Sequence, residues 1–220
     1  MIAYRRLDPR RLPKETTSLA KALIGLALVR DGGGTRLAGK IVETEAYVLR
    51  DPASHAYRGQ SARNASMFLA PFHAYIYKIY GTSFCLNVSS EDESLGAAVL
   101  IRALEPLEGI ETMSKGRGAA PVRDLCRGPG RLCAAFNVDR RLDGIDLIRS
   151  DQLWLADADL SDSRVRKSKR IGISRAAHRH LRFYEAGSPY VSGPPAFRPK
   201  KSCLPGGGYA IVCSTPRRSF

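Results

Sequence analysis

Residues 74–88 have the sequence AYIYKIYGTSFCLNV, in which two runs rich in aromatic and branched side chains flank a loop that contains glycine. This pattern predicts a β-hairpin whose strands, Ala74–Tyr80 and Phe84–Val88, are joined by Gly81-Thr82-Ser83. A hairpin with two strand-like arms favours an antiparallel sheet over alternating strands and helices.

The hairpin also predicts which side chains share a face. If Tyr80 pairs with Phe84, then Tyr77 lies opposite Asn87, and cross-strand neighbours point to the same side of the sheet. A neutral amide beside a flat aromatic ring suits recognition of a planar polar ligand. An asparagine whose amide is satisfied by the backbone is the alternative.

Further strands are expected on both sides of the hairpin. Leu26–Arg30 and Arg36–Tyr47 have strand-like composition and flank a glycine-rich turn at residues 31–34. Ala97–Leu104 is another apolar run of the same type. Because no Gly-Lys-Ser/Thr follows the turn glycines, they do not form a phosphate-binding loop.

Helices are expected at Ser18–Ile24, starting with Pro106–Met113, and at Arg131–Phe136 after Gly128-Pro129-Gly130. Thr16 or Thr17 can cap the first helix, and Gly25 would end it. Strands that follow strands with short links, and few helices, predict an α+β fold. We expect a single mixed domain: a curved antiparallel or mixed β-sheet with surrounding helices and the hairpin projecting from it.

The domain is predicted to cover residues 1–192, followed by a loosely ordered tail at 193–220 that is rich in Pro, Gly and basic residues. Residues 114–122 are small, basic and glycine-rich, which indicates a mobile surface loop. Residues 161–170 are charged and nearly lack large apolar side chains, so we expect an exposed excursion there.

The charge of the chain is unusual. Its 220 residues include 35 Lys and Arg but only 21 Asp and Glu, which gives a formal net charge of +14. Such an excess attracts polyanions, of which nucleic acid is the commonest. Contact with anionic lipid, or a basic protein without such a partner, stays possible on charge alone, and charge does not distinguish an enzyme from a passive binder.

Composition also bears on the compartment. Five cysteines without CxxC spacing (Cys85, Cys126, Cys133, Cys203, Cys213) favour reduced thiols over a disulfide framework. No run approaches 18 consecutive apolar residues, and the N-terminus lacks the pattern of a secretory signal. We therefore expect a cytoplasmic protein with no membrane partner, at the nucleoid if bacterial and nuclear if eukaryotic.

Two carboxylates and an aromatic ring are predicted to share one face of a strand. In Ile41-Val42-Glu43-Thr44-Glu45-Ala46-Tyr47, the period of two places Glu43, Glu45 and Tyr47 together. Such a face usually points to solvent, and that interpretation competes with a catalytic one.

Three further residues admit a functional and an ordinary interpretation. Tyr80, at an exposed hairpin tip of a basic protein, could wedge between stacked bases or be a lone surface tyrosine. Arg102 interrupts an apolar run, so it either reaches the surface or meets an anion such as phosphate. His55 and His73 lack cysteines at zinc spacing, which makes metal binding a weak hypothesis.

An ordered set of motifs resembles the alkyladenine (3-methyladenine) DNA glycosylase family. They are Val42–Tyr47, Asp51–Ala56, Arg63-Asn64, Met67-Phe68, Tyr75–Gly81, Asn87-Val88, Leu100–Ala103, Gly128-Pro129, Arg182–Tyr184 and Gly187–Pro189. The similarity extends over roughly Ser18 to Ser192. No single motif is decisive, but the ordered set is specific.

The resemblance implies a monofunctional enzyme that flips damaged nucleotides out of double-stranded DNA and excises alkylated purines in base excision repair. The implied substrates are 3-methyladenine and 7-methylguanine, with hypoxanthine and ethenoadenine as further candidates. The family is also expected to act as a monomer, without cofactor, metal or Schiff-base lysine.

By the same resemblance, Glu45 is the carboxylate that activates the attacking water, with Arg102 beside it and touching the DNA backbone. Tyr47, His55 and Tyr77 are implied walls of the base pocket, and Asn87 a group that discourages undamaged guanine. Tyr80 is the implied wedge, on a DNA-contacting tip with Gly81 and Thr82.

The chemistry is consistent with these roles. Cleavage of an N-glycosidic bond develops positive charge on the sugar, so an ionised carboxylate both accepts a proton from water and stabilises the transition state. We therefore expect Glu45 to be ionised near neutral pH and to lie where water can reach it. Sequence physics alone does not choose between Glu43 and Glu45.

Some residues depart from the family pattern. Phe72 and His73, and the pair Ser61-Ala62, could reshape the pocket rim and alter which lesions are accepted. His178–His180 also depart from it, and Cys203 and Cys213 in the tail remain unexplained. Two rival functions are a catalytically silent nucleic-acid-binding protein and a small-molecule nucleosidase, and the charge of +14 argues against the latter.

Overall fold

The computed structural model describes residues 2–32, 34–118, 120–160 and 164–193. In these residues nine strands form one sheet, with strand order β1-β7-β2-β3-β6-β5-β4, and β9 pairs with both β3 and β8. Every strand pair in the sheet is antiparallel. The expected α+β class therefore holds, with an antiparallel sheet rather than a mixed one.

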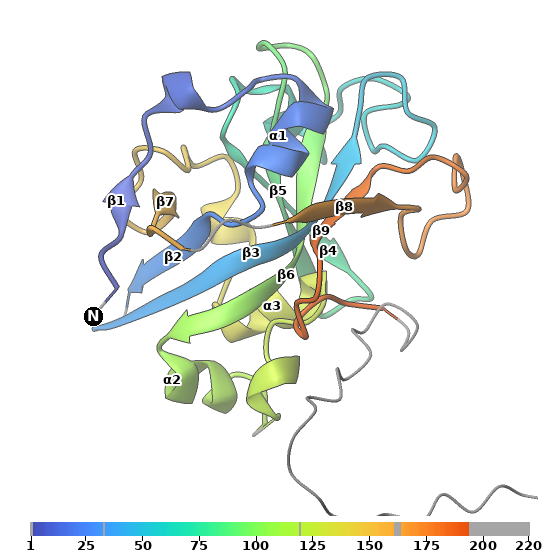
Figure 1. Cartoon of the computed structure of the whole chain (residues 1–220). Helices are drawn as coiled ribbons and strands as arrows, with labels where there is room; N and C mark the ends of the chain where they lie inside the picture. Colours follow the sequence, from blue (N-terminus) through green and yellow to red (C-terminus); the bar gives the residue numbers. More distant parts are fainter. Residues whose placement is uncertain (1, 33, 119, 161–163, 194–220) are drawn as a thin grey trace, which may run out of the picture.

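The strands are β1 (Arg5–Arg6), β2 (Ala27–Gly32), β3 (Thr35–Tyr47), β4 (Ala74–Ile79), β5 (Ser83–Ser89), β6 (Ala98–Glu108), β7 (Leu153–Asp157), β8 (Val165–Ser168) and β9 (Arg182–Glu185). The helices are α1 (Thr16–Ala22), α2 (Ile110–Lys115) and α3 (Pro129–Ala135). Short 3₁₀ turns lie at Pro9–Arg11, Ala65–Phe68, Val122–Asp124 and Arg140–Leu142. Figure 1 shows α1 beside β3, and α3 beside β5 and β6.

Two long strands form the middle of the sheet. β3 has 13 residues and β6 has 11, and nearly all side chains in the second half of β3 and the first half of β6 are buried. Apolar side chains from both strands join those of α1 and α3 in one hydrophobic core, including Leu19, Ile41, Ile101, Leu104 and Phe136. Burial of this surface is the main favourable contribution to folding.

The first helix is capped differently from the prediction. Glu15, not a threonine, accepts hydrogen bonds from the amides of Thr17 (2.9 Å) and Ser18 (2.6 Å). The Thr16 hydroxyl is engaged elsewhere, 3.0 Å from the Ser90 hydroxyl, so it is not available as a cap. Gly25 follows the helix with φ +94°, as expected of a residue that ends a helix.

The hairpin is present, but its predicted register was wrong by two residues. Tyr75 pairs with Asn87 and Tyr77 with Cys85, and the strands end at the Ile79–Ser83 pair. Tyr80 has φ +49°, so it belongs to the turn and cannot extend the strand. Since a shift of two preserves the alternation of side chains, the predicted faces are retained.

Two other element boundaries differ from the prediction. Pro106 lies in β6 opposite Gly39, at a register shift, and α2 begins only after Gly109, whose φ is +78°. Residues 165–168 form β8, because pairing with β9 uses backbone groups and needs no apolar side chains. Val165, Arg166 and Lys167 are exposed as expected, whereas Arg170 is buried.

The predicted loop at 114–122 overlaps structure at both ends, since Ser114 and Lys115 belong to α2 and Val122 begins a 3₁₀ turn. The predicted tail from residue 194 onward, with Cys203 and Cys213, lies outside the described residues. No helix in the described part of the chain is long and apolar enough to cross a membrane.

Candidate active site

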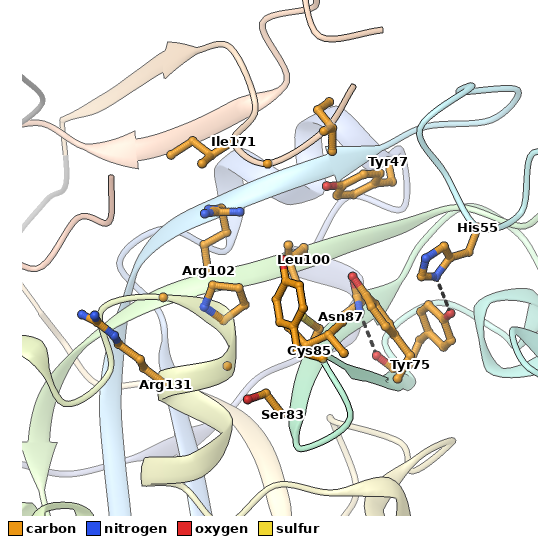
Figure 2. Close-up of a pocket in the computed structure, with 18 of the residues that line it drawn as sticks. Tyr47, His55, Tyr75, Ser83, Cys85, Asn87, Leu100, Arg102, Arg131 and Ile171 are labelled. Atoms are coloured by element: carbon orange, nitrogen blue, oxygen red, sulfur yellow. Dashed lines mark hydrogen bonds between the residues drawn. The ribbon is translucent and has the colours of Figure 1, made fainter. Parts of the chain in front are cut away.

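A pocket of about 660 Å³ opens beside the ends of β3, β4, β5 and β6. Its lining comes from Tyr47, Ala53–His55, Met67, Tyr75, Tyr77, Ile79, Tyr80, Ser83, Cys85, Asn87, Leu100, Arg102, Arg117, Gly128–Arg131, Ala134 and Ile171–Ile173. Figure 2 shows Tyr47, Ile171 and Arg102 along one side, with Cys85, Asn87 and Tyr75 across from them.

Side chains alternate between the two faces of the β4–β5 hairpin, and those on one face line this pocket. Tyr75 and Tyr77 of β4 face the same side as Cys85 and Asn87 of β5. Their sequence neighbours, such as Ile76 and Leu86, point the other way into the core and are fully buried. Tyr77 and Asn87 therefore both line the pocket as predicted, although the predicted strand register was wrong by two residues.

Three rings form one wall. The imidazole of His55 lies 4.5 Å from the Tyr77 ring in an edge-on arrangement, and the Tyr75 and Tyr77 rings are 5.4 Å apart. His55 Nδ1 and the Tyr75 hydroxyl are 2.8 Å apart and hydrogen-bonded. Burial, with the nearby Arg63 charge, lowers the pKa of His55, which favours a neutral ring at neutral pH.

Sequence reasoning missed Tyr75 as a wall of the pocket. The signal was present, because Tyr75 and Tyr77 are two residues apart in a strand and must share a face. Asn87 Nδ2 donates to the Tyr75 carbonyl at 2.9 Å. The alternative that the backbone satisfies Asn87 is thus correct for its amide nitrogen. The residue nevertheless lines the pocket.

Glu45 lies directly behind this lining. Its Oε1 accepts from the amide of Ile171 (2.8 Å), and its Oε2 accepts from the Tyr47 hydroxyl (3.0 Å). Arg102 Nη1 lies 3.3 Å from Oε1. All three donors favour an ionised carboxylate.

The expectation that water reaches Glu45 was wrong for this structure, because the residue is fully buried. Tyr47 and Ile171, which line the pocket, cover its two oxygens. Burial raises the pKa of Glu45 above its usual range, while Arg102, the Ile171 amide and the Tyr47 hydroxyl oppose that rise. Glu45 also faces Glu43 on its own strand, whose charge raises the pKa further.

Glu43 is also buried, so the solvent-facing interpretation of this strand was wrong. Its Oε1 accepts from Arg182 Nε (2.6 Å), Arg102 Nε (3.2 Å) and the Ser192 hydroxyl (3.0 Å). Its Oε2 accepts from the Ser192 amide at 2.6 Å. Glu43 does not line the pocket, and its partners connect β3 to β6, β9 and the segment before residue 193.

Arg102 lies between the two carboxylates. Its guanidinium is buried with 9% of the side chain exposed, so the interpretation that it extends to the surface was wrong. The anions that it meets in the fold are Glu43 and Glu45. It also lines the pocket, which leaves a contact with DNA phosphate as a prediction.

Tyr80 is 93% exposed at the tip of the hairpin. Gly81 follows with φ +73°, and the Thr82 amide closes the turn on the Ile79 carbonyl at 3.3 Å. Both Tyr80 and Ile79 border the pocket. The turn therefore presents a large ring to solvent at the mouth of the site.

The residues that depart from the family pattern do not line the pocket. Phe72 is buried in the hydrophobic core, and His73 Nδ1 is hydrogen-bonded to the Ala70 carbonyl at 2.9 Å. Ser61 donates its amide and hydroxyl to the Asn64 side chain, at 2.6 and 3.0 Å. None of these residues, nor Ala62 or His178–His180, lines the pocket.

No group of three or more potential ligand residues that could hold a metal occurs within the described ranges. His55 and His73 are engaged with Tyr75 and Ala70 as described above. Cys85, Cys126 and Cys133 are buried free thiols, and burial raises the pKa of Cys126 to about 12.

A second hollow of about 590 Å³ adjoins the pocket and shares Arg102, Arg117, Gly128 and Arg131 with it. Arg123 and Arg127 also line it, and Asp124 is the acidic residue in its lining. The excess of guanidinium groups makes this hollow attractive to phosphate.

A strongly basic protein whose aromatic pocket has a carboxylate behind its wall and arginines at its edge belongs to the enzymes that act on bases of nucleic acid. The sequence profile of the methylpurine-DNA glycosylase family matches residues 10–189, and the chain belongs to that family. It is accordingly a DNA glycosylase, a hydrolase of N-glycosidic bonds in DNA.

Individual relatives agree. A Mesorhizobium japonicum protein, named as a candidate 3-methyladenine DNA glycosylase, is 54% identical over 83% of this chain and 88% of its own length. The mouse DNA-3-methyladenine glycosylase is 44% identical over 85% of this chain and 61% of its own. The human DNA-3-methyladenine glycosylase is 44% identical over 79% of this chain and 63% of its own.

Proposed function

We propose that this protein flips an alkylated purine nucleotide out of double-stranded DNA and hydrolyses the bond between base and sugar, as the first step of base excision repair. The proposed substrates are 3-methyladenine and 7-methylguanine, with hypoxanthine and ethenoadenine as further candidates. The observation that carries the proposal is the placement of Glu45 and Arg102 directly beside a pocket walled by Tyr47, Tyr77 and His55.

The walls favour a damaged base over an intact one. A purine alkylated at N3 or N7 is cationic, and each electron-rich tyrosine face stabilises a cation by about 0.5–2 kcal/mol. His55, held neutral by burial, adds no positive charge that would repel the base. Damaged bases also pair and stack less well, which lowers the cost of flipping.

Glu45 is the proposed general base. Its two oxygens accept hydrogen bonds from Ile171 and Tyr47 and lie beside the Arg102 charge. Because Glu45 is fully buried behind these residues, the proposal requires Tyr47 or Ile171 to move aside before the carboxylate can take a proton from water. Its negative charge also stabilises the cationic sugar of the transition state.

Arg102 holds Glu45 ionised, and a cationic leaving base needs little assistance from an acid. No covalent intermediate on the protein is required, since water is the nucleophile. Water attacks the sugar carbon, the carbon–nitrogen bond breaks, and the base leaves with the bonding electrons.

Tyr80, with Gly81 and Thr82, is the proposed element that enters the duplex as the nucleotide leaves it. An exposed ring at a tight turn can fill the space of the flipped base. The basic hollow lined by Arg117, Arg123 and Arg131 is the proposed contact with the phosphates beside it. We expect the protein to act as a monomer, in the compartment that holds the DNA.

The test is release of free base from duplex DNA alkylated at adenine N3 and guanine N7, without added metal, by the wild type and by Glu45→Gln. We expect release by the wild type and none by the variant, with both binding DNA. Tight DNA binding without release by either would contradict the proposal and favour a silent binder. Equal release from free nucleosides, insensitive to salt, would favour a nucleosidase.

A further inference from the structure

Asp51 and Arg170 form an ion pair in which both side chains have 0% exposed surface. Arg170 donates to both carboxylate oxygens of Asp51, with Nη2 3.1 Å from Oδ1, and Nη1 also donates to the Ala46 carbonyl at 2.9 Å. Removing two charges from water costs several kcal/mol for each ion, and mutual attraction often does no more than offset that cost. Stability alone is therefore a weak reason for a pair in this place.

The pair joins three separate segments that line the pocket. Asp51 accepts from the Ala53 amide at 3.0 Å and begins the turn that carries Ala53, Ser54 and His55. Arg170 immediately precedes Ile171–Ile173, a second lining segment. Its guanidinium carbon lies 4.7 Å from the centre of the Tyr47 ring, at the end of β3.

Two of these segments hold the proposed general base. The Ile171 amide and the Tyr47 hydroxyl donate to different oxygens of Glu45, at 2.8 and 3.0 Å. Arg170 is the chain neighbour of the first donor and stacks on the ring of the second. A shift of the guanidinium would therefore move both donors.

We propose that Asp51 and Arg170 are a positioning pair, which fixes the Glu45 carboxylate and the Tyr47 ring in the geometry needed for base release. The inference rests on the proposed function of Glu45 and adds to it two fully buried residues that do not line the pocket. Arg170 sits in a run of charged residues that the sequence alone assigned to an exposed excursion.

The pair has a consequence that a purely structural role would not have. Glu45 is surrounded by Arg102 of β6, Cys85 of β5, and Glu43 and Tyr47 of its own strand, together with the Ile171 amide. Displacing the amide removes a donor that stabilises the ionised form. The pH at which release fails on acidification should then rise.

The test compares Asp51→Asn and Arg170→Lys with the wild type in single-turnover release of base, at saturating enzyme and well below each melting temperature. Asp51→Asn keeps the shape of the side chain and removes its charge, whereas Arg170→Lys keeps the charge and removes the two-pronged geometry. We expect release about 10- to 100-fold slower, an acid limb at higher pH, and unchanged affinity for undamaged duplex.

Glu185→Gln is the matched control. It breaks the Lys40–Glu185 ion pair (2.6 Å, side chains 7% and 14% exposed), which lies between β3 and β9 and does not line the pocket. We expect this variant to lose stability while it keeps the wild-type rate of release and the wild-type acid limb.

Wild-type rates and an unmoved acid limb in both variants would overturn the proposal, because the pair would then serve stability alone. If Asp51→Asn does not fold, Arg170→Lys decides by the same two measurements. If the wild type itself releases no base, the proposed function has failed and this inference fails with it.

Discussion

Glu43 and Glu45 lie two residues apart on β3 and both are buried, but they bind different partners. Glu45 is joined to Tyr47 and Ile171, which line the pocket. Glu43 is joined to Arg182 and Ser192, which do not line it. The geometry therefore supports Glu45 as the base and Glu43 as the group that fixes Arg102 from behind.

Glu45→Gln should reduce single-turnover release by about 10²–10⁴-fold, because a neutral amide cannot accept the proton of water. Glu43→Gln should retain measurable release but lower the free energy of unfolding by about 3–5 kcal/mol, since it removes the carboxylate charge that pairs with the buried Arg182 and Arg102. Release rates and denaturant melts of both variants measure this. A Glu43→Gln variant that is stable but inactive would reverse the assignment.

The pH dependence of release follows from the raised pKa of Glu45. The ionised form is the active one, so release should fall as the pH is lowered through that pKa, at a pH above the 4.5 of an ordinary glutamate. Arg102→Gln removes the charge that opposes the rise, and its acid limb should move to still higher pH. A limb that moves to lower pH, or stays fixed, would contradict this account.

Individual site residues were predictable from the sequence to different degrees. Tyr77 and Asn87 follow from strand alternation, and Tyr75 could have been found in the same way. The burial of Glu43 and Glu45 could not, because it depends on β6, β9 and Arg182, which lie far along the chain. The burial of Arg170 could not be predicted, because its neighbours in the sequence are charged. Of the described residues 164–170, Arg170 alone is buried.

The β4–β5 hairpin is the element that presents Tyr80, the proposed wedge, to solvent at the mouth of the pocket. The hairpin was predictable from two strand-like runs around a glycine. Its register was not, because Tyr80 adopts a positive φ and belongs to the turn, which the identity of a tyrosine does not indicate. Similarly, β8 could not be predicted. It pairs with β9 through backbone hydrogen bonds, which do not require alternating apolar side chains in the sequence. The central strand β3 was predicted to within one residue, whereas β6 runs on to Glu108, into a segment that was predicted to be helical.

Tyr80→Ala should weaken the capture of flipped bases and leave the chemical step unchanged once a base is bound. The ring is 93% exposed and touches the pocket only at its mouth, so its loss should not disturb the fold. A fluorescent base analogue opposite the lesion reports flipping, and single-turnover release reports chemistry. Tyr57→Ala, which removes another exposed ring from outside the pocket lining, is the control. Unchanged flipping in Tyr80→Ala would reduce Tyr80 to a surface residue.

At the scale of the whole molecule, part of the positive charge lies beyond the predicted domain of residues 1–192. Val191 and Ser192 are tied to the fold through Arg127, which donates to the Val191 carbonyl at 2.9 Å, and through Glu43. Beyond Gly193 the sequence contains five Lys and Arg and no Asp or Glu. These contacts tie the chain to the fold as far as Ser192, and a domain that ends there stays a prediction.

A chain that stops at Gly193 should therefore fold and release base at the wild-type rate when enzyme is saturating. Its affinity for DNA should decrease, and the slope of log affinity against log salt should become shallower by about 0.9 for each phosphate that the shortened chain no longer neutralises. Melting curves, single-turnover release and salt titrations measure the three quantities. Failure of the shortened chain to fold would show that the domain extends into the tail.

The bonds of Glu43 also bear on how the protein is made. Its partners Arg182 and Ser192 lie 139 and 149 residues further along the chain, whereas Arg102 lies 59 residues away, so the ribosome must synthesise nearly the whole domain before Glu43 can acquire all of its partners. Contacts between such distant residues form late and slowly during folding. A nascent or prematurely terminated chain that lacks Arg182 would have to bury Glu43 without its closest counter-ion. The complete set of bonds around Glu43, which fixes Arg102 beside Glu45, can therefore form only after Ser192 has been synthesised.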